Sequence, residues 1–280
     1  MGHPARTQRR GTTRSGAARK IAAQRAAERA RRRRLWLAGG SVTVVIALVV
    51  AIFAVKALRQ PAARSSAAVT LTSVAQQVTN VPAGRLSSVG TGQASALVPT
   101  RGNQPLLTSG GKPEVLYMGG EYCPFCAAER WALTVALSRF GTFSGLRFIH
   151  SAPDDGYIPT LTFYGSHYTS RYVSFDPVEW YSENSRVTLQ QPTSAQLALF
   201  SRYNAPPYVS SNDSGGLPFV DIGNRYLALG AQYEPTLLSG LTWKQIAAGL
   251  SNPGSPVAQA IDGAANTITK ALDNLTGLHR

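Results

Sequence analysis

Hydrophobic and polar residues follow three patterns along this chain, and each pattern is typical of one kind of element. Leu35–Val55 is an uncharged, apolar run of 21 residues. At about 1.5 Å per residue, a helix of this length crosses the roughly 30 Å apolar layer of a bilayer. In residues 256–275 apolar side chains recur every three or four positions, which predicts an amphipathic helix. Short apolar runs bounded by Gly or Pro predict strands.

In chain order, these patterns predict strands and helices that alternate and then end in a hairpin. Strands are predicted at 114–118, 145–152, 160–165, 170–175, 219–222 and 225–229, and helices at 71–82, 126–140, 193–204, 242–250 and 256–275. Thr193 is the predicted N-cap of its helix. Gly223-Asn224 is the predicted hairpin turn. This order favours an α/β fold with a mixed sheet and flanking helices.

The positive charge of the chain is concentrated at its N-terminus. The formal net charge is +14, but residues 1–34 hold 12 of the 28 Lys and Arg and one of the 14 Asp and Glu. The body is therefore close to neutral. The tail consists mainly of Arg, Ala, Gly and Thr, a composition typical of disordered segments. Nucleic-acid binding by this tail is an alternative, but membrane topology and anionic lipid headgroups already account for the charge, so we predict no nucleic-acid partner.

The basic tail and the apolar run together predict the topology. The positive-inside rule places residues 1–34 in the cytoplasm and 35–55 across the cytoplasmic membrane as a single-pass helix. A cleaved signal peptide is the alternative, but both segments are longer than such a signal. Residues 56–70 are rich in Ala and Ser and are predicted to form a linker. Residues 71–280 are then an extracytoplasmic domain.

Both cysteines of the chain lie in the stretch "GGEYCPFCAAERW", residues 119–131, where a predicted strand meets a predicted helix. Pro124 suits the first position of a helix, so Cys123 is the expected N-cap. At that place free backbone N–H groups and the helix dipole favour a thiolate. Cys126 lies one turn later and can form a disulfide with Cys123. We therefore predict that Cys123 attacks a substrate and that Cys126 resolves the mixed disulfide.

Other interpretations of the cysteine pair are less well supported. A structural zinc site needs four ligands, and the four histidines of the chain show no ligand spacing beside this pair. Two inert buried cysteines are a further alternative, but an oxidising compartment and the strand-to-helix context argue against it. A purely structural disulfide across two residues would stabilise little. We predict neither a metal nor a cofactor.

Two segments carry a resemblance to known proteins. "EVLYMGGEYCPFCAAERW" (114–131) resembles the first strand and active-site helix of thioredoxin-like proteins, and "GGLPFVDIGN" (215–224) resembles the segment with their cis-proline. More narrowly, "EYCPFCAAERWAL", "ALSRFGTF" and "DIGN" resemble a prokaryotic family, domain of unknown function 929, from about residue 70 to the C-terminus. The resemblance implies a thioredoxin-like mixed sheet in which residues 157–216 are an insertion before the cis-Pro strand.

The resemblance also implies roles for individual residues. Cys123 would be the nucleophile and Cys126 the resolving thiol. Pro218 would be the cis-proline that faces the two cysteines. The backbone of Leu217 would pair with a bound substrate strand. Tyr122 and Phe125, which flank Cys123, are expected to contact the substrate.

The chain departs from thioredoxin at two points. Tyr117 aligns with the buried aspartate of thioredoxin, so a base for the resolving thiol is missing from its usual place. Glu121 and Glu129 are candidates for a proton relay, and the alternative for each is an ordinary solvated carboxylate. The dipeptide between the cysteines is Pro-Phe rather than the Gly-Pro of thioredoxin. It differs from the Pro-His of strong oxidases and resembles the Pro-Tyr of glutaredoxins, which implies no extreme reduction potential.

These features together predict a membrane-anchored thiol–disulfide oxidoreductase that acts on thiols or disulfides of envelope or secreted proteins. Oxidation or isomerisation is favoured because the outer compartment is oxidising. The cysteine pair would then be reset by a membrane redox partner. An extracytoplasmic thiol reductase and a non-catalytic thioredoxin-like binding module are the alternatives.

Overall fold

The computed structural model describes residues 62–185 and 187–279. The predicted basic tail, residues 1–34, and the predicted membrane helix, residues 35–55, lie outside the described residues. Among the helices of the described ranges, none has both the length and the apolar character that a membrane span requires.

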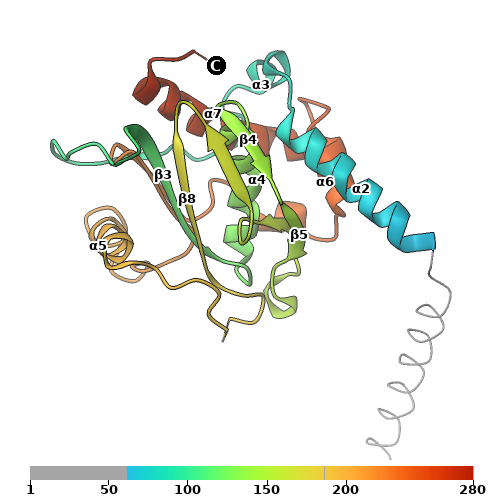
Figure 1. Cartoon of the computed structure of the whole chain (residues 1–280), viewed down its shortest axis with the longest axis horizontal. Coiled ribbons are helices and arrows are strands. Elements are labelled where there is room, and N and C mark those ends of the chain that lie inside the picture. The colour runs from blue at the N-terminus through green and yellow to red at the C-terminus, as the bar shows by residue number, and fades with distance from the viewer. Residues whose placement is uncertain (1–61, 186, 280) are drawn as a thin grey trace, which may run out of the picture. The chain divides into compact units, whose positions relative to one another are not determined.

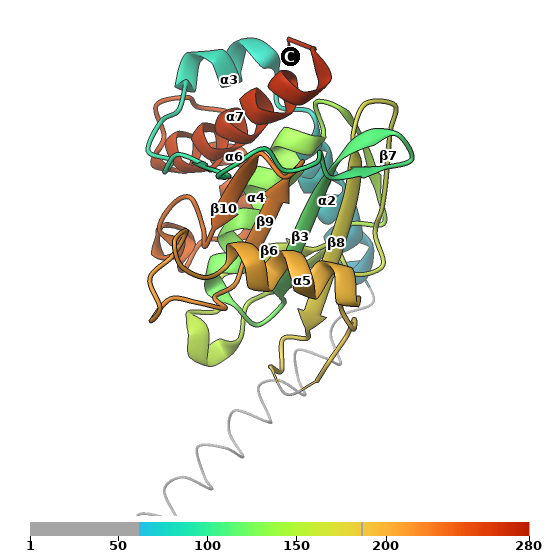
Figure 2. The same cartoon turned by 90° about the vertical axis from the view of Figure 1, so that its left-hand side faces the viewer.

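A six-stranded mixed sheet forms the centre of the described domain, and Figure 2 shows it face on. Its strands are β1 (Val98–Pro99), β2 (Thr108–Ser109), β3 (Lys112–Gly120), β8 (Ser174–Tyr181), β9 (Phe219–Ile222) and β10 (Tyr226–Leu229). The strand β3 is central because it pairs in parallel with β8 and antiparallel with β9. The hairpin partner β10 follows β9, and β1 closes that edge. The predicted mixed sheet is thus confirmed.

Helices cover both faces of this sheet (Figures 1 and 2). The helices are α2 (Ala62–Thr79), α3 (Ala83–Val89), α4 (Pro124–Leu137), α5 (Ser194–Tyr203), α6 (Trp243–Gly249) and α7 (Pro256–Thr276), with short 3₁₀ turns η1 (Pro153–Asp155) and η2 (Pro235–Leu238). The helices α4 and α7 pack together on one face, and α5 lies on the other. The domain therefore has three layers.

The residues of β3 explain why the sheet is covered on both sides. Val115 and Tyr117 belong to the core under α4 and α7, whereas Leu116 and Met118 belong to the core under α5. Successive side chains of a strand point to opposite faces. A run of buried apolar residues without alternation therefore places β3 in the middle of the domain.

The helices α2 and α3 contribute to the larger of the two cores. Val74 and Val78 of α2 and Leu86 of α3 are buried there. The turn after α3 lies against α7 so closely that a Cβ atom on Gly263 would come within 2.5 Å of the carbonyl oxygen of Thr91. Only glycine at position 263 permits this contact.

Two small sheets stand apart from the main one. In one, β4 (Gly141–Ser144) pairs with β7 (His167–Ser170), and in the other β5 (Arg147–His150) pairs with β6 (Pro159–Thr162). The strand predicted at 145–152 is thus present as β5, which pairs with β6.

The parallel neighbour of β3 is β8, which lies within the insertion predicted at 157–216. That prediction was wrong in part, because β8 is a strand of the main sheet and α5 covers one face of that sheet. The strand β8 was not recognised as part of the main sheet because its sequence lacks the apolar pattern of a buried strand. It contains Asp176, Pro177 and Glu179, and the last is fully buried through an ion pair that sequence alone does not reveal.

The predicted linker also needs a correction. Residues 62–70 are helical and form the first half of α2, whose second half was predicted from residue 71. Alanine is the strongest helix former, and this run is rich in alanine. The helix ends at Thr79, shortly before Pro82, as predicted.

The predicted cap of α5 is confirmed. The Thr193 hydroxyl accepts a hydrogen bond from the Gln196 backbone N–H at 3.2 Å, and the Gln196 side chain accepts one from the Thr193 N–H at 2.7 Å. This reciprocal pair is a capping box.

We expect Thr193→Ala to lower the free energy of unfolding by about 1 kcal/mol, because it leaves a helix N–H group without its acceptor. Guanidinium unfolding of the full chain in detergent micelles measures the effect as a lower midpoint with an unchanged slope. Thr193→Ser keeps the hydroxyl and is the matched control. Equal midpoints for the alanine and wild-type chains would contradict the role of the cap.

Candidate functional site around Cys123 and Cys126

The two cysteines lie where the central strand passes into the helix α4. The strand β3 ends at Gly120, a two-residue turn follows, and α4 begins at Pro124. Cys123 is the N-cap, and its sulfur accepts a hydrogen bond from the backbone N–H of Cys126 at 3.3 Å. The predicted N-cap and the predicted place of Pro124 are both confirmed.

The two thiols have opposite acidities. The pKa of Cys123 lies below its usual value, mainly because a hydrogen bond from the Cys126 side chain stabilises its thiolate. Burial opposes this shift, and the Cys126 N–H and the positive charge of Arg130 reinforce it. The pKa of Cys126 is raised well above its usual value, mainly by complete burial and also by its hydrogen bond with Cys123. Cys123 therefore has the more nucleophilic sulfur at neutral pH.

The segment before β9 meets the cysteines in space. The peptide bond between Leu217 and Pro218 is cis, as the resemblance implied. The thiol of Cys123 lies 3.6 Å from the carbonyl oxygen of Leu217 and donates to it. The Pro206-Pro207 bond, in the loop between α5 and β9, is also cis.

The predicted substrate contacts lie beside this junction. Phe125 is 47% exposed, which is unusual for a phenylalanine, whereas the half-buried Tyr122 packs edge-on against Tyr181. Phe125 and Leu217 also line a hollow of about 420 Å³. The rest of its wall comes from Leu229 and from the loop after α5. A partly apolar hollow therefore lies against Leu217, whose carbonyl oxygen contacts the Cys123 thiol.

The two carboxyl groups that were candidates for a proton relay are both buried, so the alternative of a solvated surface residue is wrong for each. Glu121 is 6% exposed, and burial raises its pKa. Glu129 is fully buried, and burial raises its pKa to about 7. One carboxylate oxygen of Glu129 accepts from the Gln232 backbone N–H at 3.1 Å. A role in proton transfer stays a prediction for both.

Arg130 and Glu179 form a buried ion pair that was not predicted from the sequence. The Arg130 Nε and Nη2 atoms donate to the two carboxylate oxygens of Glu179 at 2.8 and 2.7 Å, and both side chains are 0% exposed. One signal was available. Arg130 lies four residues after Cys126 and seven after Cys123, and this spacing places all three on one helix face.

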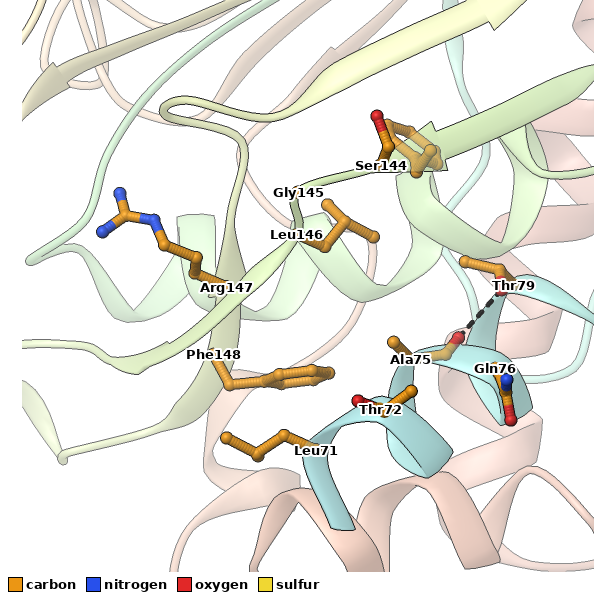
Figure 3. A pocket seen from close by; sticks show the side chains of 11 residues that line it. Leu71, Thr72, Ala75, Gln76, Thr79, Ser144, Gly145, Leu146, Arg147 and Phe148 are labelled. Atoms are coloured by element: carbon orange, nitrogen blue, oxygen red, sulfur yellow. Dashed lines mark hydrogen bonds between the residues drawn. The ribbon is translucent and has the colours of Figure 1, made fainter. Parts of the chain in front are cut away.

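A second hollow lies away from the cysteine pair, between α2 and the segment that joins β4 to β5 (Figure 3). Its volume is about 470 Å³, and Leu71, Leu146 and Phe148 point into it. Among the described residues that line it, Arg147 is the one that carries a charge. Within residues 62–185 and 187–279, no three His, Cys, Asp or Glu side chains are placed to hold a metal ion.

Comparison with known sequences gives the family. A sequence model of the family described as Domain of unknown function (DUF929) matches residues 101–274. The chain belongs to this family. The match begins later than the residue near 70 at which we expected the similarity to start. No curated protein and no solved structure matches the chain.

The DUF929 segment contains every feature of the site described above. The cysteine pair, Arg130, Glu179 and Pro218 all fall within residues 101–274. The helices α2 and α3 precede it.

Proposed function

We propose that this protein is a thiol–disulfide oxidoreductase whose reactive group is the Cys123–Cys126 pair. The observation that carries the proposal is the contrast between the two thiols. Cys123, at 6% exposure, has a lowered pKa, while the fully buried Cys126 has a raised one. A thiolate at the N-terminus of a helix, next to a protonated partner thiol, is the arrangement that disulfide exchange uses.

The arrangement of the chain supports a thioredoxin-like fold. The strand that leads into the cysteine helix lies between a parallel strand and an antiparallel strand, and the antiparallel one follows a cis-proline. The Leu217 carbonyl next to the Cys123 sulfur agrees with the implied role of Leu217 in pairing with a substrate strand. Fold alone does not assign an activity, so the proposal rests on the site.

In the oxidising direction, a substrate thiolate attacks the Cys123 sulfur of the Cys123–Cys126 disulfide. The S–S bond breaks, a mixed disulfide forms at Cys123, and Cys126 leaves and takes a proton. A second substrate thiolate then attacks the mixed disulfide and releases Cys123 as a thiolate. The substrate has lost two electrons and two protons. The pair holds both electrons and one proton, and the solvent receives the other proton.

We favour oxidation or isomerisation of envelope or secreted proteins over reduction. The apolar run 35–55 and the basic tail before it support a single membrane anchor with the domain outside the cytoplasmic membrane. That compartment is oxidising, and a membrane redox partner would accept the two electrons when the pair is reset. The hollow beside Phe125 and Leu217 supports an extended polypeptide as substrate.

Two measurements on the full chain in detergent micelles test the proposal. We expect iodoacetamide to alkylate Cys123 much faster than Cys126 at pH 7, because the pKa of Cys123 is lowered, whereas Cys126 is fully buried and its pKa is raised. Equilibration in glutathione buffers gives the reduction potential. A value of roughly −120 to −180 mV favours an oxidase or isomerase, and one near about −270 mV favours a reductase. A cysteine pair that forms no disulfide would contradict the proposal. The non-catalytic binding module would then be the remaining alternative.

A further inference from the structure

The buried ion pair between Arg130 and Glu179 has no explanation in stability. Taking two charges out of water costs several kcal/mol for each ion, and well-packed apolar residues in the same place are often as stable or more stable. Both side chains are 0% exposed. The guanidinium of Arg130 is also incompletely hydrogen-bonded, because its Nη1 atom is buried without a hydrogen-bond partner in the described part of the chain. Such a group calls for an explanation.

The hydrogen bonds of Arg130 offer an explanation for the buried ion pair. Its Nη2 atom donates to the carbonyl oxygen of Gly120 at 2.7 Å. The same carbonyl accepts the backbone N–H of Cys123 at 3.2 Å. The guanidinium is therefore joined through a single carbonyl group to the residue that carries the reactive sulfur. Glu179, on the parallel strand β8 beside Gly119, fixes the guanidinium in place by a two-point contact.

We propose that Arg130, held by Glu179, is a positioning residue that stabilises the reduced, negatively charged state of the cysteine pair and so makes its disulfide more oxidising. The inference rests on the proposed function of the same site. Of the two redox states, only the reduced one carries a thiolate. A fixed positive charge nearby therefore favours that state, and the negative charge of Glu179 limits the effect.

Other ionisable groups, from the elements packed around the two thiols and the ion pair, also contribute to the electrostatics of this site. They are Tyr117, Glu121, Tyr122, Cys126, Asp155, Tyr181 and Glu183. The ring of Tyr117 lies 5.9 Å from the guanidinium carbon, and burial raises the pKa of this phenol well above its usual value. Arg130 is the cation that acts on Tyr117, Glu121 and both thiols.

The test compares variants that change the local charge in opposite directions. In the full chain in detergent micelles, the pH midpoint of Cys123 alkylation is measured together with the reduction potential. Arg130→Met is expected to raise the midpoint by about one unit, so that alkylation at acidic pH falls about tenfold, and to lower the potential. Glu179→Gln is expected to shift both in the opposite direction. Loss of packing alone would not produce opposite signs.

Three further variants keep the test decisive if a single charge removal impairs folding. Arg130→Lys keeps the charge and is expected to stay near the wild-type midpoint. The double variant Arg130→Met/Glu179→Leu replaces the pair by apolar side chains, which removes the burial cost, and its midpoint is still expected to rise. Arg147→Met removes an exposed arginine that hydrogen-bonds to Tyr164 and is expected to change nothing.

A wild-type midpoint in the double variant, or shifts of the same sign in Arg130→Met and Glu179→Gln, would overturn the role of Arg130. That result is distinct from failure of the proposed function, which shows as a wild-type pair that forms no disulfide.

Discussion

Cys126→Ser is expected to convert the protein into a trap for its substrates. Cys123 keeps its N-cap position, and the serine hydroxyl can still donate to its sulfur, so Cys123 still attacks a substrate disulfide. The mixed disulfide then persists because no resolving thiol is present. Turnover in disulfide exchange should fall at least about a hundredfold, as it does when one member of a catalytic unit is removed. Adducts with oxidised glutathione and with a disulfide-linked unfolded peptide, separated on non-reducing gels, measure the trapping.

Cys123→Ser is the matched variant and is expected to give the same loss of turnover without any adduct. The remaining Cys126 is fully buried, and its raised pKa keeps it protonated. Equal adduct formation by both variants would contradict the proposed roles of Cys123 as nucleophile and Cys126 as resolving thiol. Adduct formation by Cys123→Ser alone would contradict these roles as well.

Glu129→Gln is expected to stabilise the protein at pH 8 but not at pH 5. Burial raises the pKa of Glu129 from 4.5 to about 7. Between these values the folded state keeps a proton that the unfolded state has lost, so stability falls as pH rises through this window and levels off above pH 7. The uncharged amide removes this loss, which is on the order of 3 kcal/mol at pH 8. It can still accept the hydrogen bond from the Gln232 N–H.

Guanidinium unfolding at pH 5 and pH 8 measures this difference. Glu234→Gln removes an exposed carboxyl group nearby and is the control, with no expected change. Burial also raises the pKa values of Asp221 and Asp262 to about 7, so part of the pH dependence remains in the Glu129 variant. Equal stabilities of wild type and Glu129→Gln at pH 8 would show that Glu129 is not buried as a titrating carboxyl group.

Local patterns predicted much of this fold. The periodic apolar face of residues 256–275, the turn at Gly223-Asn224 and the cap at Thr193 are properties of short segments, and each was found where it was predicted. The place of Cys123 at the start of α4 was also predicted, because Pro124 restricts the first helical turn.

The parts that sequence did not reveal depend on contacts between distant segments. Arg130 and Glu179 are 49 residues apart, and each alone resembles an ordinary surface residue. Their pairing allows the polar strand β8 to lie beside the central strand β3 with Glu179 fully buried. For the same reason the burial of Glu129 could not be predicted, since it follows from the packing of Gln232 against the helix α4.

The packing of α2 and α3 on the larger core has a practical consequence for how the protein is divided for expression. Val74, Val78 and Leu86 are buried in that core, yet all three precede residue 101, where the family match begins. A truncation designed on the family boundaries would remove these three side chains and leave apolar surface of the core, including the part of α7 that packs against α3, open to water. We therefore expect the smallest part that folds independently to be longer than the family match at residues 101–274 and to include α2 and α3.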